Sequence, residues 1–208
     1  MIELFTADTP NGKKISIMLE EIKYDYKVTK VNILKDEQFT PEFKKISPFN
    51  KIPVIRDHKK NICIFESGAI LIYLGEQSGK LYDQDKRTII NQWLIAQVAY
   101  IGPMLGQHHQ FHHYNPGKSE FAEDRYLKIC TRIYKELDER LAQSDYLSGN
   151  FYSIADIATF PWIARHEWHD IGLKNYKNLT RWYELVSKRD AVQKGYDLLE
   201  KGEKIPSV

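Results

Sequence analysis

The chain has 208 residues, enough for one large domain or two small ones with a sizeable buried core. Hydrophobic residues make up 42% of it, charged residues 28% and aromatic residues 12%, a composition that argues against disorder. Its 30 basic and 28 acidic residues are spread along the sequence and give a net charge of +2, so nothing favours nucleic acid or an anionic membrane as a partner.

Neither a membrane span nor an export signal is predicted. The longest apolar runs, such as residues 68–74, are too short to cross a bilayer. The first residues, MIELFTADTP, lack a basic segment and place Glu3 in the first predicted strand. Cys63 and Cys130 lie far apart in apolar sequence, which predicts two reduced core thiols of a cytoplasmic protein.

The first eighty residues are predicted to alternate strands and helices. Residues 2–5 form a strand, and a turn at residues 9–12 leads into an amphipathic helix over residues 13–22. Alternating apolar residues predict a second strand over 26–31, and Pro41 suits the first turn of a short helix. The β-α-β beginning implies a parallel strand pair with a right-handed crossover.

Residues 50–67 carry the most informative stretch, NKIPVIRDHKKNICIFES. It reads as two short strands joined by a Lys-rich turn, with Ser67 as the N-cap of the next helix. Pro53 at a strand start leaves the preceding backbone extended and able to pair. The first N–H groups of the helix would receive a carboxylate. This pattern fits a site for a short extended peptide along Ile52, or simply a hairpin packed on a capped helix.

The remaining chain is predicted to be all-helical. Residues 87–102 and 120–143 form long helices, the first broken or kinked at Gly102-Pro103, and Ser153 with Asp156 forms a capping box. Two more helices follow, over residues 179–187 and 191–200. The expected domains are therefore a small α/β domain over 1–79 and a helical domain over 87–208, with a linker over 80–86.

Five segments, in this order, resemble the cytosolic glutathione transferases, and among them the bacterial Nu class: TPNGKKI (9–15), ISPFNKIP (46–53), FESGAI (65–70), GPMLGQ (102–107) and YSIADIA (152–158). The resemblance covers essentially the whole chain. It implies a thioredoxin-like N-terminal domain followed by an all-α C-terminal domain, a cis peptide bond before Pro53, and a homodimer. It also implies glutathione as cosubstrate and disulfide-bond reduction as the activity.

The residues themselves limit how thiol chemistry could occur. Thioredoxins carry a Cys-x-x-Cys at the turn into the first helix, where this chain has Thr9-Pro10-Asn11-Gly12. The protein therefore cannot supply its own dithiol, and the thiols must come from a cosubstrate. Thr9 and Asn11 are the candidate catalytic residues, because hydrogen-bond donors at a helix N-terminus stabilise a thiolate. Ordinary turn and cap duty is the alternative for both.

By matching position, the resemblance implies the remaining glutathione contacts. The γ-glutamyl end would meet Glu66 and Ser67, and the cysteinyl backbone would pair with Ile52 beside Pro53. The glycyl carboxylate would meet Lys51, with Gln38 assisting. Arg132 would take a further carboxylate, although an i,i+4 ion pair with Glu136 is the alternative. The second-substrate pocket is assigned to Gln107 and His108.

The histidines do not predict a metal site. His108 with His112 and His109 with His113 have i,i+4 spacing, but no Asp, Glu or Cys lies nearby in the sequence to complete a site. The segment HEWH at residues 166–169 is one residue short of a zincin motif. No metal is therefore expected, and the four tryptophans are expected in the core.

The sequence is compatible with three functions. The first is reduction of small disulfides by bound glutathione, with small-molecule thiols and disulfides as substrates. The second is conjugation of glutathione to small electrophiles, which requires an apolar second pocket. The third is a non-catalytic module that binds glutathione on the same scaffold.

Overall fold

The computed structural model describes residues 1–208. The chain forms two compact units, one of residues 1–82 with 189–204 and one of residues 83–188 with 205–208. The domain boundaries expected from the sequence stay a prediction. Residues 189–204, which were expected in the helical domain, lie with the first unit.

The first unit is built on a four-stranded mixed sheet with the order β2-β1-β3-β4. Its strands are β1 (Ile2–Thr6), β2 (Tyr26–Lys30), β3 (Val54–Asp57) and β4 (Ile62–Phe65). β1 and β2 pair in parallel, and the β1–β3 and β3–β4 pairs are antiparallel. All four predicted strands and the parallel pair are confirmed.

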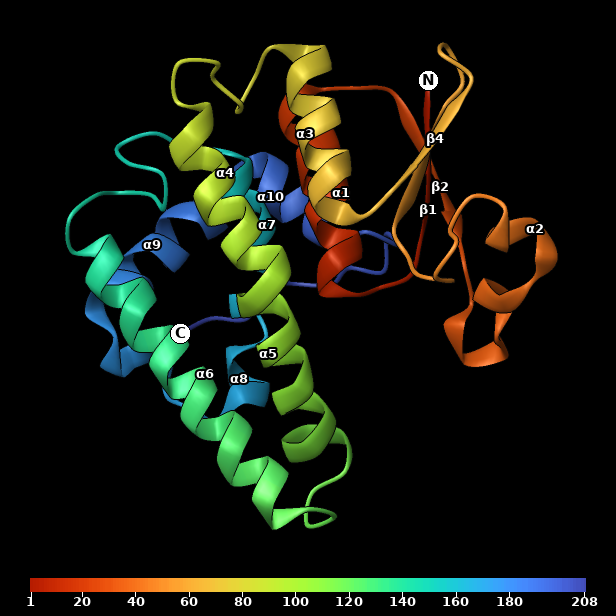
Figure 1. The fold of residues 1–208 in the computed structure, drawn as a ribbon. Helices are drawn as coiled ribbons and strands as arrows, with labels where there is room; N and C mark the ends of the chain where they lie inside the picture. Colours follow the sequence, from red (N-terminus) through yellow and green to blue (C-terminus); the bar gives the residue numbers. More distant parts are fainter. The chain divides into compact units, whose positions relative to one another are not determined.

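Helices cover both faces of this sheet (Figure 1). α1 (Pro10–Ile22) and α3 (Ser67–Ser78) lie side by side over one face. Short α2 (Pro41–Lys44) lies on the other, where Phe43 packs against Val31 and Val54. Because side chains alternate along a strand, Leu4 and Ile55, opposite each other in the register, point to the face away from Phe43 and are fully buried.

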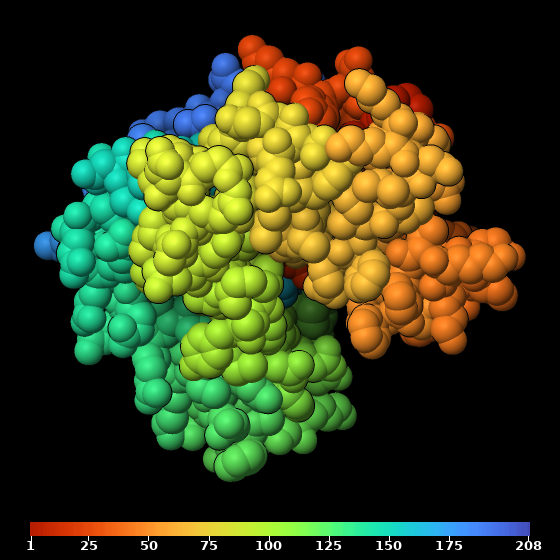
Figure 2. Space-filling view, turned by 45° about the horizontal axis from the view of Figure 1, so that its top comes forward, coloured from red at the N-terminus to blue at the C-terminus, as the bar shows by residue number.

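Much of the segment between β2 and β3 is exposed. It contains the 3₁₀ turns η1 (Ile33–Lys35) and η2 (Glu37–Phe39) before α2. Figure 2 shows it as an orange lobe beside the lighter-orange β3–β4 segment. Apolar side chains stand out on it, with Leu34 93%, Phe39 60% and Phe49 71% exposed.

The C-terminal α10 (Asp190–Tyr196) packs on α1. A Cβ on Gly195 would lie 2.5 Å from the Cα of Ile17, so the two helix backbones approach where no side chain intervenes. Ser16 Oγ donates to the Gly195 carbonyl at 2.5 Å. Arg189 binds Glu21 through two hydrogen bonds of 2.6 and 2.9 Å. These contacts explain why residues 189–204 belong to the first unit.

The second unit is helical. Its helices are α4 (Arg87–Ala96), α5 (Gly102–His108), α6 (Glu120–Leu141), α7 (Ile154–Ile163), α8 (His166–His169) and α9 (Lys177–Ser187), with the 3₁₀ turn η5 (Leu173–Asn175). Two π-helical segments, Gln97–Ile101 and His109–Tyr114, flank α5. No helix has the length and apolar character needed to cross a membrane.

Three local predictions need correction. The Gly102-Pro103 pair does not break the helix, because Pro103 lies in the first turn of α5, and the irregular backbone is the π-helical segment before it. α1 begins at Pro10, since Thr9 is its N-cap. Ser67 is the first residue of α3, and Glu66 precedes it at the cap with a φ of 70°.

Candidate functional site

A cavity of about 150 Å³ lies in the first unit, beside the first residues of α1 and α3 and the residues that precede β3. Six of the predicted site residues line it: Asn11, Lys51, Ile52, Pro53, Glu66 and Ser67. The other lining residues are Ser47, Phe49 and Phe65. Segments more than fifty residues apart in the chain thus meet around one small opening.

The stretch before β3 has its backbone fixed by Ser47. The buried Ser47 hydroxyl donates to the Lys51 carbonyl at 2.7 Å and accepts from the Lys51 N–H at 3.0 Å. The Ile52–Pro53 peptide bond is cis, as expected. Ile52 lies just outside the β-ladder, whose register ends at Val54, and it lines the cavity. Sequence reasoning gave Ser47 no role of its own.

The N-terminus of α1 contributes Asn11 to the cavity. Thr9 caps this helix, its Oγ1 accepting from the Gly12 N–H at 3.1 Å. A Cβ on Gly12 would lie 2.4 Å from Thr6 Oγ1, so the loop closes over this position only with glycine. The Thr9 hydroxyl hydrogen is not used by this cap contact, because the oxygen acts there as acceptor.

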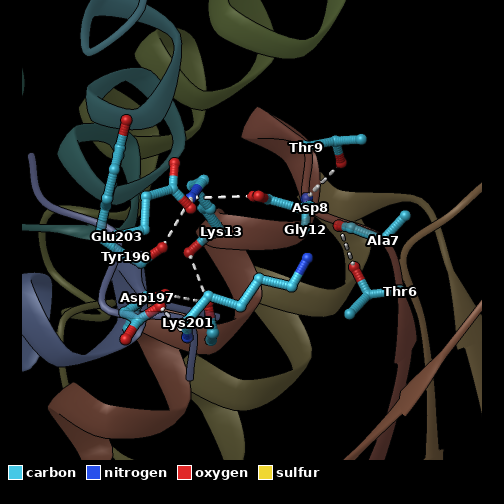
Figure 3. Close-up of polar contacts among 12 residues, drawn as sticks. Thr6, Ala7, Asp8, Thr9, Gly12, Lys13, Tyr196, Asp197, Lys201 and Glu203 are labelled. Atoms are coloured by element: carbon cyan, nitrogen blue, oxygen red, sulfur yellow. Dashed lines mark hydrogen bonds and ion pairs between the residues drawn. The ribbon is translucent and has the colours of Figure 1, made fainter. Parts of the chain in front are cut away.

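Lys13 ties the start of α1 to the C-terminal segment (Figure 3). Its fully buried Nζ lies 2.9 Å from Asp8 and 2.5 Å from Glu203, and donates to the Tyr196 carbonyl at 2.7 Å. The ammonium also lies 3.9 Å from the centre of the Tyr196 ring. The loop that carries Thr9 is therefore braced by residues almost two hundred positions away.

Lys14 is the second buried lysine of this helix, with 1% of its surface exposed. Its Nζ donates to Ser67 Oγ at 3.2 Å, behind the start of α3. Burial lowers the pKa of Lys14 to about 7, and the Glu66 carboxylate opposes that shift. The sequence did not identify Lys13 or Lys14, although two lysines amid the apolar residues of one helix were a possible signal.

The other predicted contacts lie apart from this cavity lining. Gln38 is half-buried in η2, and its Nε2 donates weakly to the Ile33 carbonyl at 3.4 Å. Arg132 and Gln107 are exposed on α6 and α5 of the second unit. The i,i+4 ion pairs of α6 are Lys128–Asp124 and Lys135–Glu139, and Arg132 is in neither. The assignments of Gln38, Arg132 and Gln107 stay predictions.

The second unit contains a packed cluster of histidines. His108 is fully buried, with Nε2 2.8 Å from the His169 carbonyl, and its ring stacks on His112 at 4.7 Å. His109 stacks on His169 at 4.7 Å, and the Tyr134 hydroxyl lies 2.6 Å from His169 Nδ1. Burial lowers the pKa of His109 to about 3. No group of three or more potential ligands is arranged to hold a metal ion.

Both units of the chain are similar to proteins of one known family. The family model for the N-terminal domain of glutathione S-transferases matches residues 2–76, and that for the C-terminal domain matches residues 96–190. The disulfide-bond oxidoreductase YfcG of Escherichia coli is 44% identical over 198 residues, covering 92% of each chain. The chain belongs to the glutathione S-transferase family. The family resemblance and the fold class predicted from the sequence are thus confirmed.

Other members of this family are similar along the whole chain. The disulfide-bond oxidoreductase YghU of Escherichia coli is 36% identical over 93% of this chain and 73% of its own. A glutathione transferase of Burkholderia graminis, solved with two glutathione molecules per subunit, superposes with a TM-score of 0.91 at 37% identity, covering 97% of this chain and 89% of that one. A glutathione transferase of Pseudomonas putida was solved with one glutathione disulfide per subunit. It superposes with a TM-score of 0.89 at 40% sequence identity, covering 95% of this chain and 91% of that one.

The cysteines of this glutathione S-transferase differ from the prediction in one respect. Cys130 is buried on α6, where burial raises the pKa of its thiol to about 12. Cys63 is exposed on edge strand β4, and Arg56 Nε lies 3.5 Å from its sulfur. The expectation of a core thiol was therefore wrong for Cys63. Cys130 is the core thiol that the sequence predicted, and a buried neutral thiol is a poor nucleophile.

Proposed function

We propose that this chain is an enzyme that reduces disulfide bonds with glutathione, and that bound glutathione supplies the reacting thiol. The observation that carries the proposal is the cavity lined by Asn11, Ile52 and Ser67, at a thioredoxin-like helix start that holds no cysteine. Relatives named disulfide-bond oxidoreductases, and related structures with glutathione or its disulfide bound, support the same conclusion.

In this proposal glutathione lies extended across the cavity. Its γ-glutamyl carboxylate and amine bind Ser67 and Glu66, its cysteinyl backbone pairs with Ile52 beside Pro53, and its glycyl carboxylate faces Lys51, with Gln38 assisting. These pairings match each charged end of the peptide to a group of opposite charge or to a helix N-terminus.

The sulfur of glutathione then lies at the start of α1. Thr9 and Asn11 donate hydrogen bonds to its thiolate, lowering the thiol pKa and raising the reactive fraction at neutral pH. The thiolate attacks a small disulfide, so that one S–S bond forms as another breaks and a substrate thiolate leaves. A second glutathione attacks the mixed disulfide, giving glutathione disulfide and the second reduced thiol. The two substrate thiolates each take up a proton released by the two glutathione thiols.

We further assign the second glutathione to the helical unit, with Arg132 meeting a carboxylate and Gln107 lining its pocket, whereas His108, also predicted there, is fully buried in the histidine cluster. A homodimer in the cytoplasm, working without a metal, completes the proposal. Conjugation of glutathione to small electrophiles is the second candidate, since the family matches extend over both domains. Turnover of a chloronitroaromatic compound that exceeds disulfide reduction would favour that candidate.

The test measures reduction of the mixed disulfide of 2-mercaptoethanol and glutathione, with glutathione disulfide followed through glutathione reductase and NADPH. Hydrogen bonds to charged groups contribute about 1.5–3 kcal/mol, so Asn11→Ala is expected to lower kcat/KM about 10- to 100-fold. Gln143→Ala, which removes an exposed amide after α6, is the matched control and should leave the rate unchanged. A wild-type rate equal to buffer, or an unaltered Asn11→Ala variant, contradicts the proposal.

A further inference from the structure

The contact between Lys14 and Ser67 joins the interior of α1 to the cavity. Lys14 Nζ donates to Ser67 Oγ at 3.2 Å from a position that is 1% exposed, while Ser67 lines the cavity. Lys14 itself is not among the lining residues. Lys14 therefore lies behind Ser67 and contacts the cavity lining through that hydroxyl.

The protonation state of Lys14 determines what the Ser67 hydroxyl can offer. An ammonium group has three donors and no acceptor, so Ser67 Oγ must accept from it and keeps its own hydrogen for another acceptor. A neutral amine has a lone pair and can accept that hydrogen, which turns the hydroxyl away from the cavity. The charged form thus presents a hydrogen-bond donor toward a carboxylate, and the neutral form withdraws it.

We infer that Lys14 is a positioning residue, whose ammonium group holds the Ser67 hydroxyl as a donor toward a bound carboxylate and which takes up a proton when that carboxylate binds. This inference rests on the proposed function, since it takes the γ-glutamyl carboxylate of glutathione as the anion at Ser67. The bound carboxylate adds a negative charge close to a buried amine, and the protonated form of Lys14 becomes the favoured one.

The charges around Lys14 make this coupling active near neutral pH. Burial lowers the pKa of Lys14 to about 7, while the Glu66 carboxylate from the β4–α3 junction raises it. Lys13, the neighbouring charge on α1, is paired with Asp8 and Glu203. A ligand carboxylate raises the Lys14 pKa further. The affinity for the ligand is therefore highest below about pH 7. It falls as the pH rises above that value, because Lys14 must then take up a proton when the ligand binds.

The test uses S-methylglutathione, which carries both carboxylates but no thiol to titrate. Calorimetry at pH 7 in two buffers of different ionisation enthalpy measures the protons taken up on binding. Wild type is expected to take up about half a proton, since a group with a pKa near 7 is half charged there. Its affinity is expected to fall about five- to tenfold from pH 6 to pH 8.

Three variants separate this role from a merely structural one. Lys14→Met, of similar shape, should lose the proton uptake and the pH dependence, and bind about tenfold more weakly. Lys14→Arg keeps a permanent charge and should bind without proton uptake. His58→Asn removes the histidine of the first unit, which bonds to Glu3, and should leave the uptake as in wild type.

Binding by wild type without proton uptake, or uptake that persists in Lys14→Met, overturns the role of Lys14 and leaves the proposed function standing. Proton uptake by the wild type tests the role of Lys14 even where a variant fails to fold. Proton-coupled binding without disulfide reduction overturns the proposed catalysis alone. The absence of any binding overturns both.

Discussion

Asp156 provides the most demanding test of how the helical unit is stabilised. Its fully buried carboxylate accepts from the Leu147 N–H at 2.9 Å, the Ser153 N–H at 3.0 Å, the Trp182 Nε1–H at 2.9 Å and the Ser153 hydroxyl at 3.2 Å. Asp156→Ala would leave three buried donors without their acceptor, whereas the Ser153 hydroxyl still has Ser148 Oγ at 3.1 Å.

The magnitude follows from those three donors. Each buried donor left unsatisfied costs roughly 1–3 kcal/mol, so the loss of three is expected to lower the free energy of unfolding by about 3–9 kcal/mol. In a chain of this size that is a drop in Tm of at least about 6 °C. Trp182→Phe, which removes one donor and leaves the others bound, should cost roughly 1–2 kcal/mol for the lost hydrogen bond.

Urea and thermal unfolding of the full chain, followed by circular dichroism, measure both changes. Trp182→Phe serves as the matched comparison, because it tests one arm of the same network. A loss below about 1 kcal/mol for Asp156→Ala would show that the buried donors find other partners at little cost and that this network does not stabilise the helical unit.

Two further predictions concern the start of α1 and the histidine cluster. Thr9→Ala removes the cap of Gly12 N–H and should cost about 1 kcal/mol in urea unfolding, while Thr9→Ser keeps the acceptor and should cost less than half as much; equal losses would contradict the cap. Burial lowers the pKa of His109 to about 3, against about 6.5 when unfolded, so the folded state binds fewer protons there. Through this difference in His109 pKa, the free energy of unfolding keeps about 4–5 kcal/mol above about pH 6.5 that it loses as the pH falls toward 3. Burial also lowers the pKa values of His108, His166 and His169, so His109→Phe should make the loss of unfolding stability on acidification less steep without abolishing it, and an unchanged pH profile would contradict this.

Much of the first unit could be predicted because its signals are local. Short apolar runs indicate the strands, with a clear alternation only in the second, and Thr9 and Pro10 mark a helix start through their own hydrogen bonding and fixed φ. The cavity followed from Pro53 and Ser67, each of which shapes the backbone at its own position. Such patterns need no knowledge of distant contacts.

What escaped prediction depends on long-range packing. Lys13 and Lys14 are buried because the C-terminal segment and α3 close over α1, bringing Tyr196, Glu203 and Ser67 to their ammonium groups. A helical pattern read alone would turn lysines to solvent. Cys63 is exposed since β4 is an edge strand, a placement that an apolar sequence run does not reveal.

In the proposed reaction glutathione, and not a protein cysteine, carries the reacting sulfur. The most direct measurement is the rate of glutathione-dependent reduction of a small mixed disulfide by the Cys63→Ser, Cys130→Ala double variant, which has no thiol of its own. We expect the double variant to keep a kcat/KM within about twofold of wild type. A loss of ten-fold or more in a variant that remains folded by circular dichroism would contradict it.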